Sequence, residues 1–141
     1  MAVLAALSDV ALMIPARALV VHTKYWSVVV GDHATRYRDA LQGGITMSST
    51  RYRFGDAFTR ADYESIASER RNPAGAMLAI ELKKAAPELV CLPAVQLDDP
   101  NPTTIGLGDS FVGGFIAAIV GASQSRADPT KSEPSLARHC S

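Results

Sequence analysis

The sequence predicts an α/β fold in which helices are layered on a mostly parallel β-sheet. Two short runs rich in β-branched residues, ALVVH and WSVVVG, predict buried strands over Ala18–His22 and Trp26–Gly31. Helical segments lie on both sides of these runs in the chain, and alternation of strands with helices favours a layered sheet. A chain of 141 residues, 48% of them hydrophobic, is long enough to bury the core of one domain.

The N-terminal segment predicts a helix over Ala2–Met13, which Pro15 ends. Ser8 and Asp9 interrupt its apolar run, and no basic segment precedes that run as it would in a signal peptide. No stretch of the sequence looks long and apolar enough to span a bilayer. We therefore expect a cytoplasmic protein that does not bind a membrane.

The segment 34–54 has a helical pattern with Gly43 and Gly44 at its centre. It predicts either two helices or one helix that packs closely through its glycines. Thr59 and Asp62 then form an approximate capping pattern, which predicts a short, charged helix with one side in solvent.

A further helix start follows at Asn72 and Pro73, because asparagine is a favourable N-cap and proline is tolerated in the first helical turn. The helix places Leu78 and Leu82 one turn apart on its buried face, and Pro87 stops it.

The remainder of the chain predicts extended backbone, a loop, one more helix and a tail. ELVCLPAVQL reads as one or two extended runs broken at Pro93, and DDPNP is a turn-rich loop. A helix is expected from about residue 109 to residue 120. The segment 122–141 is rich in serine, proline and charge, and we expect it to be disordered. The predicted organisation is one α/β domain over 1–121 and a tail over 122–141.

Charge and cysteine content exclude several classes of protein. Lys plus Arg and Asp plus Glu both number 14, so the net charge is zero and a nucleic-acid binder with a broad basic surface is not expected. Cys91 and Cys140 match no zinc spacing, and a pair of reduced thiols is the simplest interpretation.

The segment TTIGLGDSFVGGF, residues 103–115, has four competing interpretations. A dinucleotide fingerprint needs a third glycine where Phe111 stands, and a Walker A loop needs a Gly-Lys pair that the chain lacks. A serine nucleophile turn needs glycine two positions after Ser110, where Val112 stands. In esterases with a GDSL motif an aspartate precedes the C-terminal histidine by three positions, but Leu136 precedes His139 here.

The third interpretation, a phosphate-binding loop with a catalytic aspartate, fits the segment best. Small residues let the backbone come close to an anion, and a helix start directs free N–H groups and the positive end of its dipole at that anion. An aspartate beside it could accept the proton of an attacking hydroxyl. The fourth interpretation remains open at this point: glycines followed by an aspartate are also an ordinary helix start.

The longer context of this loop adds a resemblance. NPTTIGLGDSFVGGF resembles the second signature of the ribokinase-like sugar kinases, in which G-x-G-D opens a helix. The usual ribokinase form is Gly-Ala-Gly-Asp after an Asp-Thr pair, whereas GLGD after Thr-Thr-Ile looks more like the ADP-dependent glucokinase and phosphofructokinase branch. VVHTKYW, YRDALQGGITMSSTRYRFGD and VCLPAVQL resemble the same branch, so that the resemblance covers roughly residues 18–120.

This resemblance implies a ribokinase-like layered fold and transfer of the β-phosphate of ADP to a hexose or hexose phosphate. It implies that Asp109 is the catalytic base and that the backbone of Gly106, Leu107 and Gly108 forms an anion hole. It places adenine against apolar residues before the loop, with Val95 and Pro102 as candidates. Three polar side chains are candidates for contact with the nucleotide phosphates: His22, Lys24 and Arg51. For His22 a histidine bonded to backbone at a strand end, and for Arg51 a solvated helix face, are the simpler interpretations.

Departures from the family pattern limit the function expected of this chain. Members of the family are about three times longer and use N-x-x-E and H-x-E elements to hold Mg²⁺. Here Gly75 stands three positions after Asn72, and no histidine is followed two positions later by glutamate. We therefore expect no metal ligands, an incomplete fold that is the C-terminal part of the large domain without the sugar-covering lid, and little kinase activity from this chain alone. A non-catalytic nucleotide-binding module and an ATP-using kinase of the ribokinase type are the alternatives.

Overall fold

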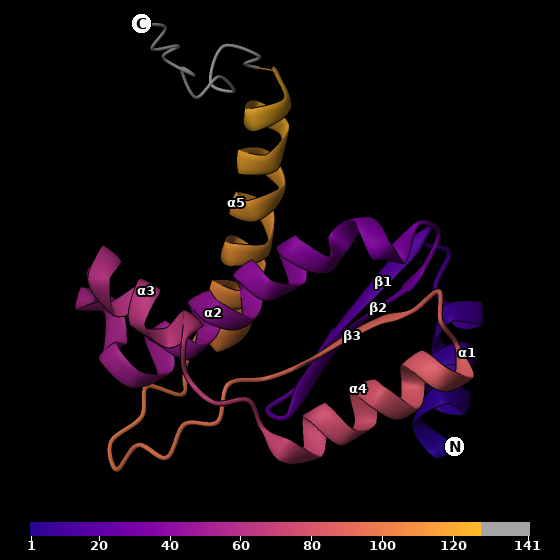
Figure 1. Ribbon diagram of the computed structural model, residues 1–141, viewed down its shortest axis with the longest axis horizontal. Helices are drawn as coiled ribbons and strands as arrows, with labels where there is room; N and C mark the ends of the chain where they lie inside the picture. Colours follow the sequence, from indigo (N-terminus) through magenta and orange to yellow (C-terminus); the bar gives the residue numbers. More distant parts are fainter. Residues whose placement is uncertain (128–141) are drawn as a thin grey trace, which may run out of the picture.

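A computed structural model describes residues 1–127 and confirms the α/β class. Its helices (3-10 helices are marked η) and strands are, in chain order, α1 (Ala2–Met13), β1 (Ala18–His22), β2 (Trp26–Gly31), η1 (Ala34–Tyr37), α2 (Arg38–Phe54), η2 (Gly55–Ala57), α3 (Arg60–Ala67), α4 (Pro73–Ala85), β3 (Val90–Pro93) and α5 (Leu107–Ala127). In Figure 1, α1 lies near the N-terminal end of the molecule, α4 runs alongside β3, and α2 leads from beside the sheet to α3 and α5.

The sheet departs from the predicted topology. The strand order is β1-β2-β3, and both strand pairs are antiparallel, so a mostly parallel sheet is not confirmed in the described residues. The connection between β1 and β2 explains the first pair, because a three-residue link can only reverse the chain. Thr23 closes this link: its hydroxyl accepts the N–H of Trp26 at 3.1 Å and donates to the Trp26 carbonyl at 2.7 Å.

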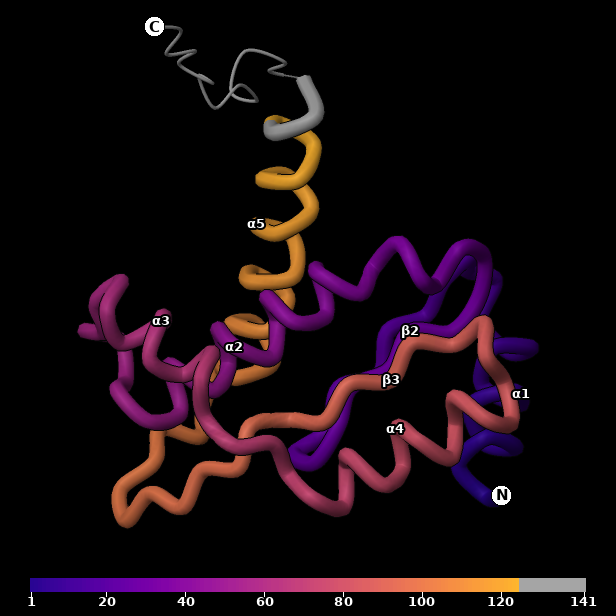
Figure 2. Tube along the Cα trace, viewed as in Figure 1, coloured from indigo at the N-terminus to yellow at the C-terminus, as the bar shows by residue number. Residues whose placement is uncertain are grey.

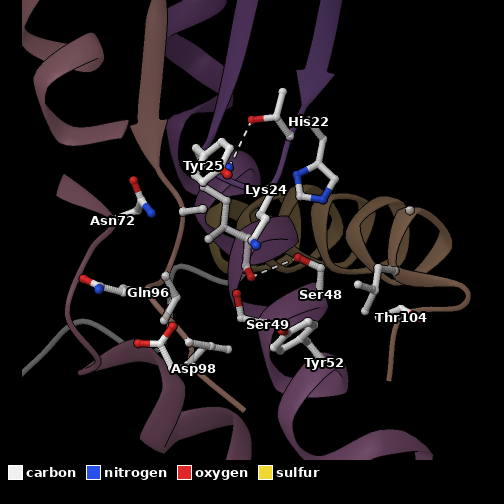
Figure 3. A pocket seen from close by; sticks show the side chains of 17 residues that line it. His22, Lys24, Tyr25, Ser48, Ser49, Tyr52, Asn72, Gln96, Asp98 and Thr104 are labelled. Carbon is white, nitrogen blue, oxygen red and sulfur yellow. Dashed lines mark hydrogen bonds between the residues drawn. The ribbon is translucent and has the colours of Figure 1, made fainter. Parts of the chain in front are cut away.

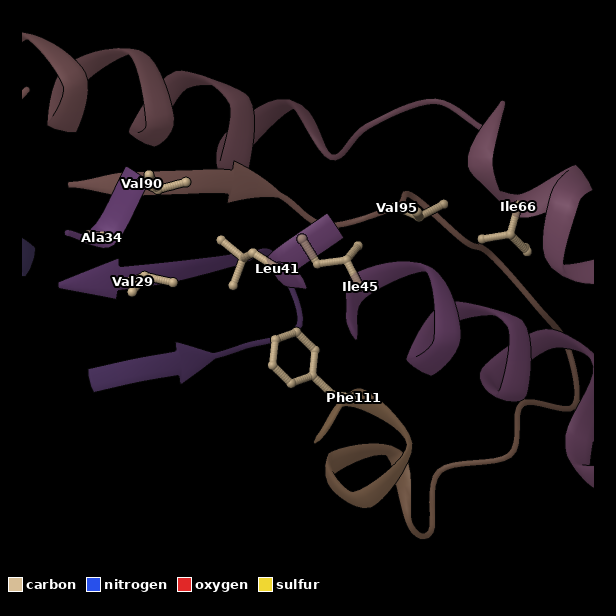
Figure 4. Packing of buried hydrophobic residues seen from close by; sticks show 8 residues of the cluster. All are labelled: Val29, Ala34, Leu41, Ile45, Ile66, Val90, Val95 and Phe111. Carbon is tan, nitrogen blue, oxygen red and sulfur yellow. The ribbon is translucent and has the colours of Figure 1, made fainter. Parts of the chain in front are cut away.

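The central strand β2 separates two apolar layers, because successive side chains point to opposite faces. Val28 and Val30 pack on one face with Leu7 of α1. Val29 points to the other face, where the larger core gathers residues from α2, α3, β3 and α5 (Figure 4). That cluster consists of Val29, Ala34, Leu41, Ile45, Ile66, Val90, Val95 and Phe111.

Most predicted helix boundaries are confirmed. The N-terminal helix spans Ala2–Met13, as expected. Asn72 caps α4 by accepting the N–H of Gly75 at 3.1 Å, and Thr59 with Asp62 forms a full capping box at the start of α3. Each such cap is worth about 1 kcal/mol.

Helix α2 resolves the ambiguity over segment 34–54. A short 3-10 turn, η1, precedes one continuous helix, and Gly43 and Gly44 lie inside it against α5. A Cβ on Gly43 would lie 2.8 Å from the Gly114 carbonyl oxygen, and one on Gly44 would lie 2.8 Å from the Phe111 ring. The two glycines therefore let α5 pack directly on the backbone of α2.

Helix α5 is longer than predicted. It begins at Leu107 instead of residue 109 and continues to Ala127, so the expected tail boundary at residue 122 falls inside it. No proline interrupts the sequence before Pro129, which lets the helix continue. The rest of the predicted tail, 128–141, lies outside the described residues.

Within the described residues, α5 also contains a span, Leu107–Gln124, that is long and apolar enough to cross a membrane. The expectation that no stretch meets this criterion is therefore wrong. Length and composition alone are weak evidence for a membrane segment, and the same span includes Asp109 and packs across α2 at Gly114.

Candidate functional site

The loop at residues 106–109 turns the chain into α5. Gly106 has φ +74°, a left-handed conformation that glycine adopts without strain. The first bond of the helix follows: the backbone N–H of Ser110 donates to the Gly106 carbonyl at 3.0 Å, and the Ser110 hydroxyl donates to the same oxygen at 2.9 Å. Ser110 thus closes the turn.

The start of α5 presents unpaired N–H groups, as expected of an anion site. The backbone N–H groups of Leu107, Gly108 and Asp109 donate to no backbone acceptor among residues 1–127. These are the groups that the first helical turn leaves free, and the helix dipole adds partial positive charge beside them. The Asp109 side chain lies in the same turn and is exposed to solvent.

Beside this loop lies a cavity of about 580 Å³, which is large enough for a small-molecule ligand. Helix α2 supplies one wall, with Ser48, Ser49 and Tyr52 on one side of the helix (Figure 3). The cavity is lined by His22, Thr23, Lys24, Tyr25, Ile45, Ser48, Ser49, Tyr52, Asn72, Ala94, Val95, Gln96, Leu97, Asp98, Thr104, Leu107 and Gly108.

Gln96 and Asp98 line the cavity on the side facing these α2 residues (Figure 3). They belong to the loop between β3 and α5, which has no regular secondary structure (Figure 2). Backbone hydrogen bonds hold it at both ends. The Asn72 N–H donates to the Ala94 carbonyl at 2.8 Å, and the Gln96 N–H donates to the Arg70 carbonyl at 2.9 Å. Nearer α5, the Thr103 N–H donates to the Tyr52 carbonyl at 3.0 Å.

The structure brings five of the predicted site residues into this cavity. His22, Lys24, Val95, Leu107 and Gly108 all line it. Val95 belongs to the main hydrophobic core and also gives the cavity an apolar surface.

The other predicted residues lie outside the cavity lining. Gly106 and Asp109 flank the two loop residues that do line it, and Asp109 opens to solvent at the helix start. Pro102 is half-buried in the preceding loop and does not line the cavity.

His22 has a side-chain partner instead of the expected backbone one. Its Nδ1 atom lies 3.0 Å from the Ser27 hydroxyl, and its ring stacks on Phe111 with the ring centroids 4.1 Å apart. Although part of the residue remains exposed, the loss of water around the ring lowers the pKa of His22. The neutral imidazole is therefore favoured at neutral pH.

Arg51 does not lie on a solvated helix face as the simpler interpretation had it. Its side chain is only 21% exposed, and its Nε donates to Asp56 at 2.6 Å. Its Nη1 lies against Gly106 and 3.5 Å from the Ser110 hydroxyl. Arg51 therefore contacts the G-L-G-D loop and does not line the cavity.

Sequence reasoning missed several polar groups in the cavity. Ser48, Ser49 and Tyr52 repeat at helical spacing with Ile45, a signal that the segment 34–54 does contain. The sequence identified Asn72 only as a helix cap, whereas the hydrogen bond from its backbone N–H to Ala94 places it in the cavity lining. Gln96 and Asp98 lie in an irregular loop, where no periodicity marks them.

Metal-binding side chains do not gather in this region. Within the described part of the chain, no group of three or more His, Cys, Asp or Glu side chains is placed to hold a metal ion. The described residues therefore offer no preformed site in which three or more of these side chains hold a metal ion. Burial raises the pKa of Cys91 to about 11, which makes that thiol a poor metal ligand and nucleophile at neutral pH.

Comparison with protein-family models and with curated proteins finds no match. Solved structures do match. A phosphofructokinase from Pyrococcus horikoshii with AMP superposes with TM-score 0.70 at 18% identity, covering 88% of this chain and 30% of that one. The chain has the fold of part of that enzyme.

Two further structures agree with this likeness. The last common ancestor of ADP-dependent phosphofructokinases from Methanosarcinales matches with TM-score 0.67 and 15% identity, over 83% of this chain and 30% of its own. An ADP-dependent kinase in complex with fructose-6-phosphate and ADPβS matches with TM-score 0.66 and 15% identity, over 92% of this chain and 33% of its own. The chain thus spans about a third of the length of these neighbours.

Proposed function

We propose that this chain provides the nucleotide-binding part of an ADP-dependent sugar kinase of the phosphofructokinase or glucokinase type. The observation that carries the proposal is the loop 106–109, whose free N–H groups begin α5 at the edge of a cavity of about 580 Å³. The solved neighbours support it, because they include enzymes with AMP and with fructose-6-phosphate and ADPβS. The acceptor would be a hexose or hexose phosphate.

In this proposal the loop binds phosphate through its backbone. The N–H groups of Leu107 and Gly108 and the dipole of α5 stabilise negative charge as it develops on the transferred phosphoryl group. The nucleoside lies in the cavity between α2 and the loop that carries Val95. Lys24, also in the lining, adds a positive charge.

Asp109 acts as the general base. It would accept the proton of the sugar hydroxyl while the oxygen attacks the β-phosphorus of ADP and AMP leaves. Its exposure leaves the carboxylate open to an acceptor sugar. We assign no step to Mg²⁺, because the described residues offer no preformed cluster of metal-binding side chains.

We further propose that this chain alone transfers phosphate slowly, because water has free access to Asp109 and, in residues 1–127, no cluster of metal-binding side chains is placed to balance the phosphate charge. A cytoplasmic location accords with charged substrates that do not cross membranes.

Binding and turnover test the proposal separately. Calorimetric titration with AMP and ADP should show binding, and Asp109→Asn should leave it within about twofold, since the carboxylate acts on the acceptor. Absence of nucleotide binding would overturn the proposal. A coupled assay with ADP, Mg²⁺ and fructose 6-phosphate or glucose should show little turnover. Rapid turnover that Asp109→Ala abolishes would confirm the base but contradict the expected inactivity.

Two alternatives make different predictions in the same experiments. The exposed base and the lack of a cluster of metal-binding side chains in residues 1–127 favour a non-catalytic nucleotide-binding module as the second candidate, which binds ADP but gives no turnover under any condition. An ATP-using kinase of the ribokinase type would bind ATP more tightly than ADP. Comparison of the two nucleotides in one titration series decides between the donors.

A further inference from the structure

Arg53 links three segments that surround the cavity, although it does not line the cavity itself. It follows Tyr52 in the last turn of α2. Its Nη1 donates to Glu69 and its Nε donates to Asp99 at 3.3 Å. We refer to these two ion pairs as the Arg53 tether.

The tether is partly shielded from water, unlike most surface ion pairs. The side chains of Arg53, Asp99 and Glu69 are 27%, 23% and 35% exposed. The hydrogen bond to Glu69, with a smaller contribution from Asp99, raises the pKa of Arg53 despite its partial burial. By contrast, Arg60 and Glu64 of α3 form an ion pair whose side chains are 91% and 61% exposed, and such pairs contribute little.

The two partners of Arg53 belong to segments that line the cavity on the side facing α2 (Figure 3). Glu69 lies in the connection that leads from α3 to Asn72, a lining residue. Asp99 directly follows Asp98, which also lines the cavity. The α2 wall is attached to Arg53 through the chain itself, since Tyr52 precedes it.

The loop around Asp99 depends on few other anchors. Its backbone is bonded at Gln96 and again at Thr103, and it forms no helix or strand between these points. Within residues 1–127, the ion pair of Asp99 with Arg53 is the one side-chain hydrogen bond that the segment between Gln96 and Thr103 makes. Asp98 lies in this interval, so its position in the cavity wall depends on that bond.

We propose that Arg53 is a positioning residue: by holding Glu69 and Asp99 at once, it ties two neighbouring segments of the cavity lining to α2 and sets their distance from that helix. The planar guanidinium suits this role, because Nε and Nη1 hold two carboxylates at a defined geometry. A lysine offers a single charged group and can hold only one of them well. The link to ligand affinity rests on the proposed nucleotide-binding function, whereas the link to loop order does not.

Hydrogen exchange of the whole chain tests the tether directly. In Arg53→Met we expect the hydrogen-bonded loop amides of Gln96 and Thr103 to exchange at least tenfold faster, while those of β2 keep their rates. Arg53→Lys should give an intermediate rate for the same amides. Arg60→Met is the matched control, since it removes an exposed arginine ion pair away from the cavity and should change neither set.

Asp99→Asn removes one arm of the tether without changing α2. It should accelerate the same loop amides, and combining it with Arg53→Met should add little, because Arg53→Met already removes the bond to Asp99. Three outcomes would overturn the proposal. The loop amides exchange at unchanged rates in both variants, the two substitutions have additive effects on these rates, or the amides of the loop and of β2 are accelerated equally. The last result would mean that Arg53 only stabilises the fold as a whole.

Nucleotide affinity provides the second readout. AMP binding to Arg53→Met should weaken about tenfold, with Arg53→Lys between it and the original chain and Arg60→Met unchanged. If Arg53→Met binds AMP as tightly as the original chain, the tether does not influence ligand binding in the cavity. If the original chain binds no AMP, the proposed function fails, and the exchange comparison still decides whether the tether orders the loop.

Discussion

Gly106 illustrates how one backbone conformation positions the candidate site. At φ +74° the chain turns so that the next three N–H groups begin α5, and the Arg51 guanidinium packs where a Cβ would lie. Glycine is thus favoured at this position by the backbone angle and by the close approach of Arg51. Gly108, two residues on, has ordinary helical geometry and open space around it.

Gly106→Ala should therefore destabilise the chain by about 1–2 kcal/mol, chiefly through the left-handed backbone, since the Arg51 side chain can move aside. Urea unfolding measures this loss. The control is Gly108→Ala, which should stay within about 0.5 kcal/mol of the original chain because its Cβ meets no atom. Equal stability of the two variants would show that the turn at Gly106 tolerates a side chain.

At the scale of elements, the site depends on the crossing of α2 and α5. These helices approach through Gly43 on α2 and Gly114 on α5, and Phe111 fills the space beside Gly44. The crossing places the first turn of α5 next to the α2 residues that line the cavity. The pair of glycines in α2 was recognised in the sequence, but their partner helix lies about 70 residues later in the chain.

Gly114→Ala should weaken this crossing, because its Cβ would lie 2.5 Å from both the Gly43 carbonyl oxygen and the Met47 Cβ. We expect a loss of about 1–3 kcal/mol in the free energy of unfolding. The adjacent Gly113→Ala faces open space and should gain about 0.5–1 kcal/mol from higher helix propensity. Thermal and urea unfolding of the pair measure the difference, and a neutral Gly114→Ala would contradict a close-packed crossing.

At the scale of the whole molecule, the cavity is an assembly of five segments: the β1–β2 turn, α2, the residue before α4, the loop after β3 and the start of α5. Helix α5 extends beyond this assembly with an apolar face in solvent. Val112, Ile116, Ile119 and Val120 lie on it at helical spacing, and each is at least 39% exposed. Monomeric proteins rarely expose such a continuous apolar surface.

We therefore expect the chain alone to self-associate near neutral pH, where its net charge is zero. Sedimentation equilibrium should show an average mass that rises with concentration, and Ile116→Lys should suppress this rise. Leu12→Lys, which adds the same charge on exposed α1, is the control and should suppress it less. A strictly monomeric chain, or equal effects of the two lysines, would contradict association through α5.

The sequence by itself determined most of the local structure. Helix starts at Thr59 and Asn72, both strands of the hairpin and the loop at 106–109 follow from short-range rules, because caps, side-chain alternation and glycine conformation act over a few residues. The resemblance to the ADP-dependent kinases singled out five of the residues that line the cavity. The resemblance of the loop to the ADP-dependent kinases agrees with the fold of the solved neighbours.

Only the tertiary structure decided how these pieces combine. The sheet is antiparallel, contrary to the prediction. The three-residue link between β1 and β2 is a local feature that already requires one antiparallel pair, whereas the pairing of β2 with β3 depends on contacts between distant segments. Gln96 and Asp98 line the same cavity as Tyr52 of α2, which lies 44 and 46 positions earlier in the chain. Arg53 pairs with Asp99, which lies 46 positions later. No local pattern encodes such a pairing, since its free energy arises only when the folded chain brings both segments together.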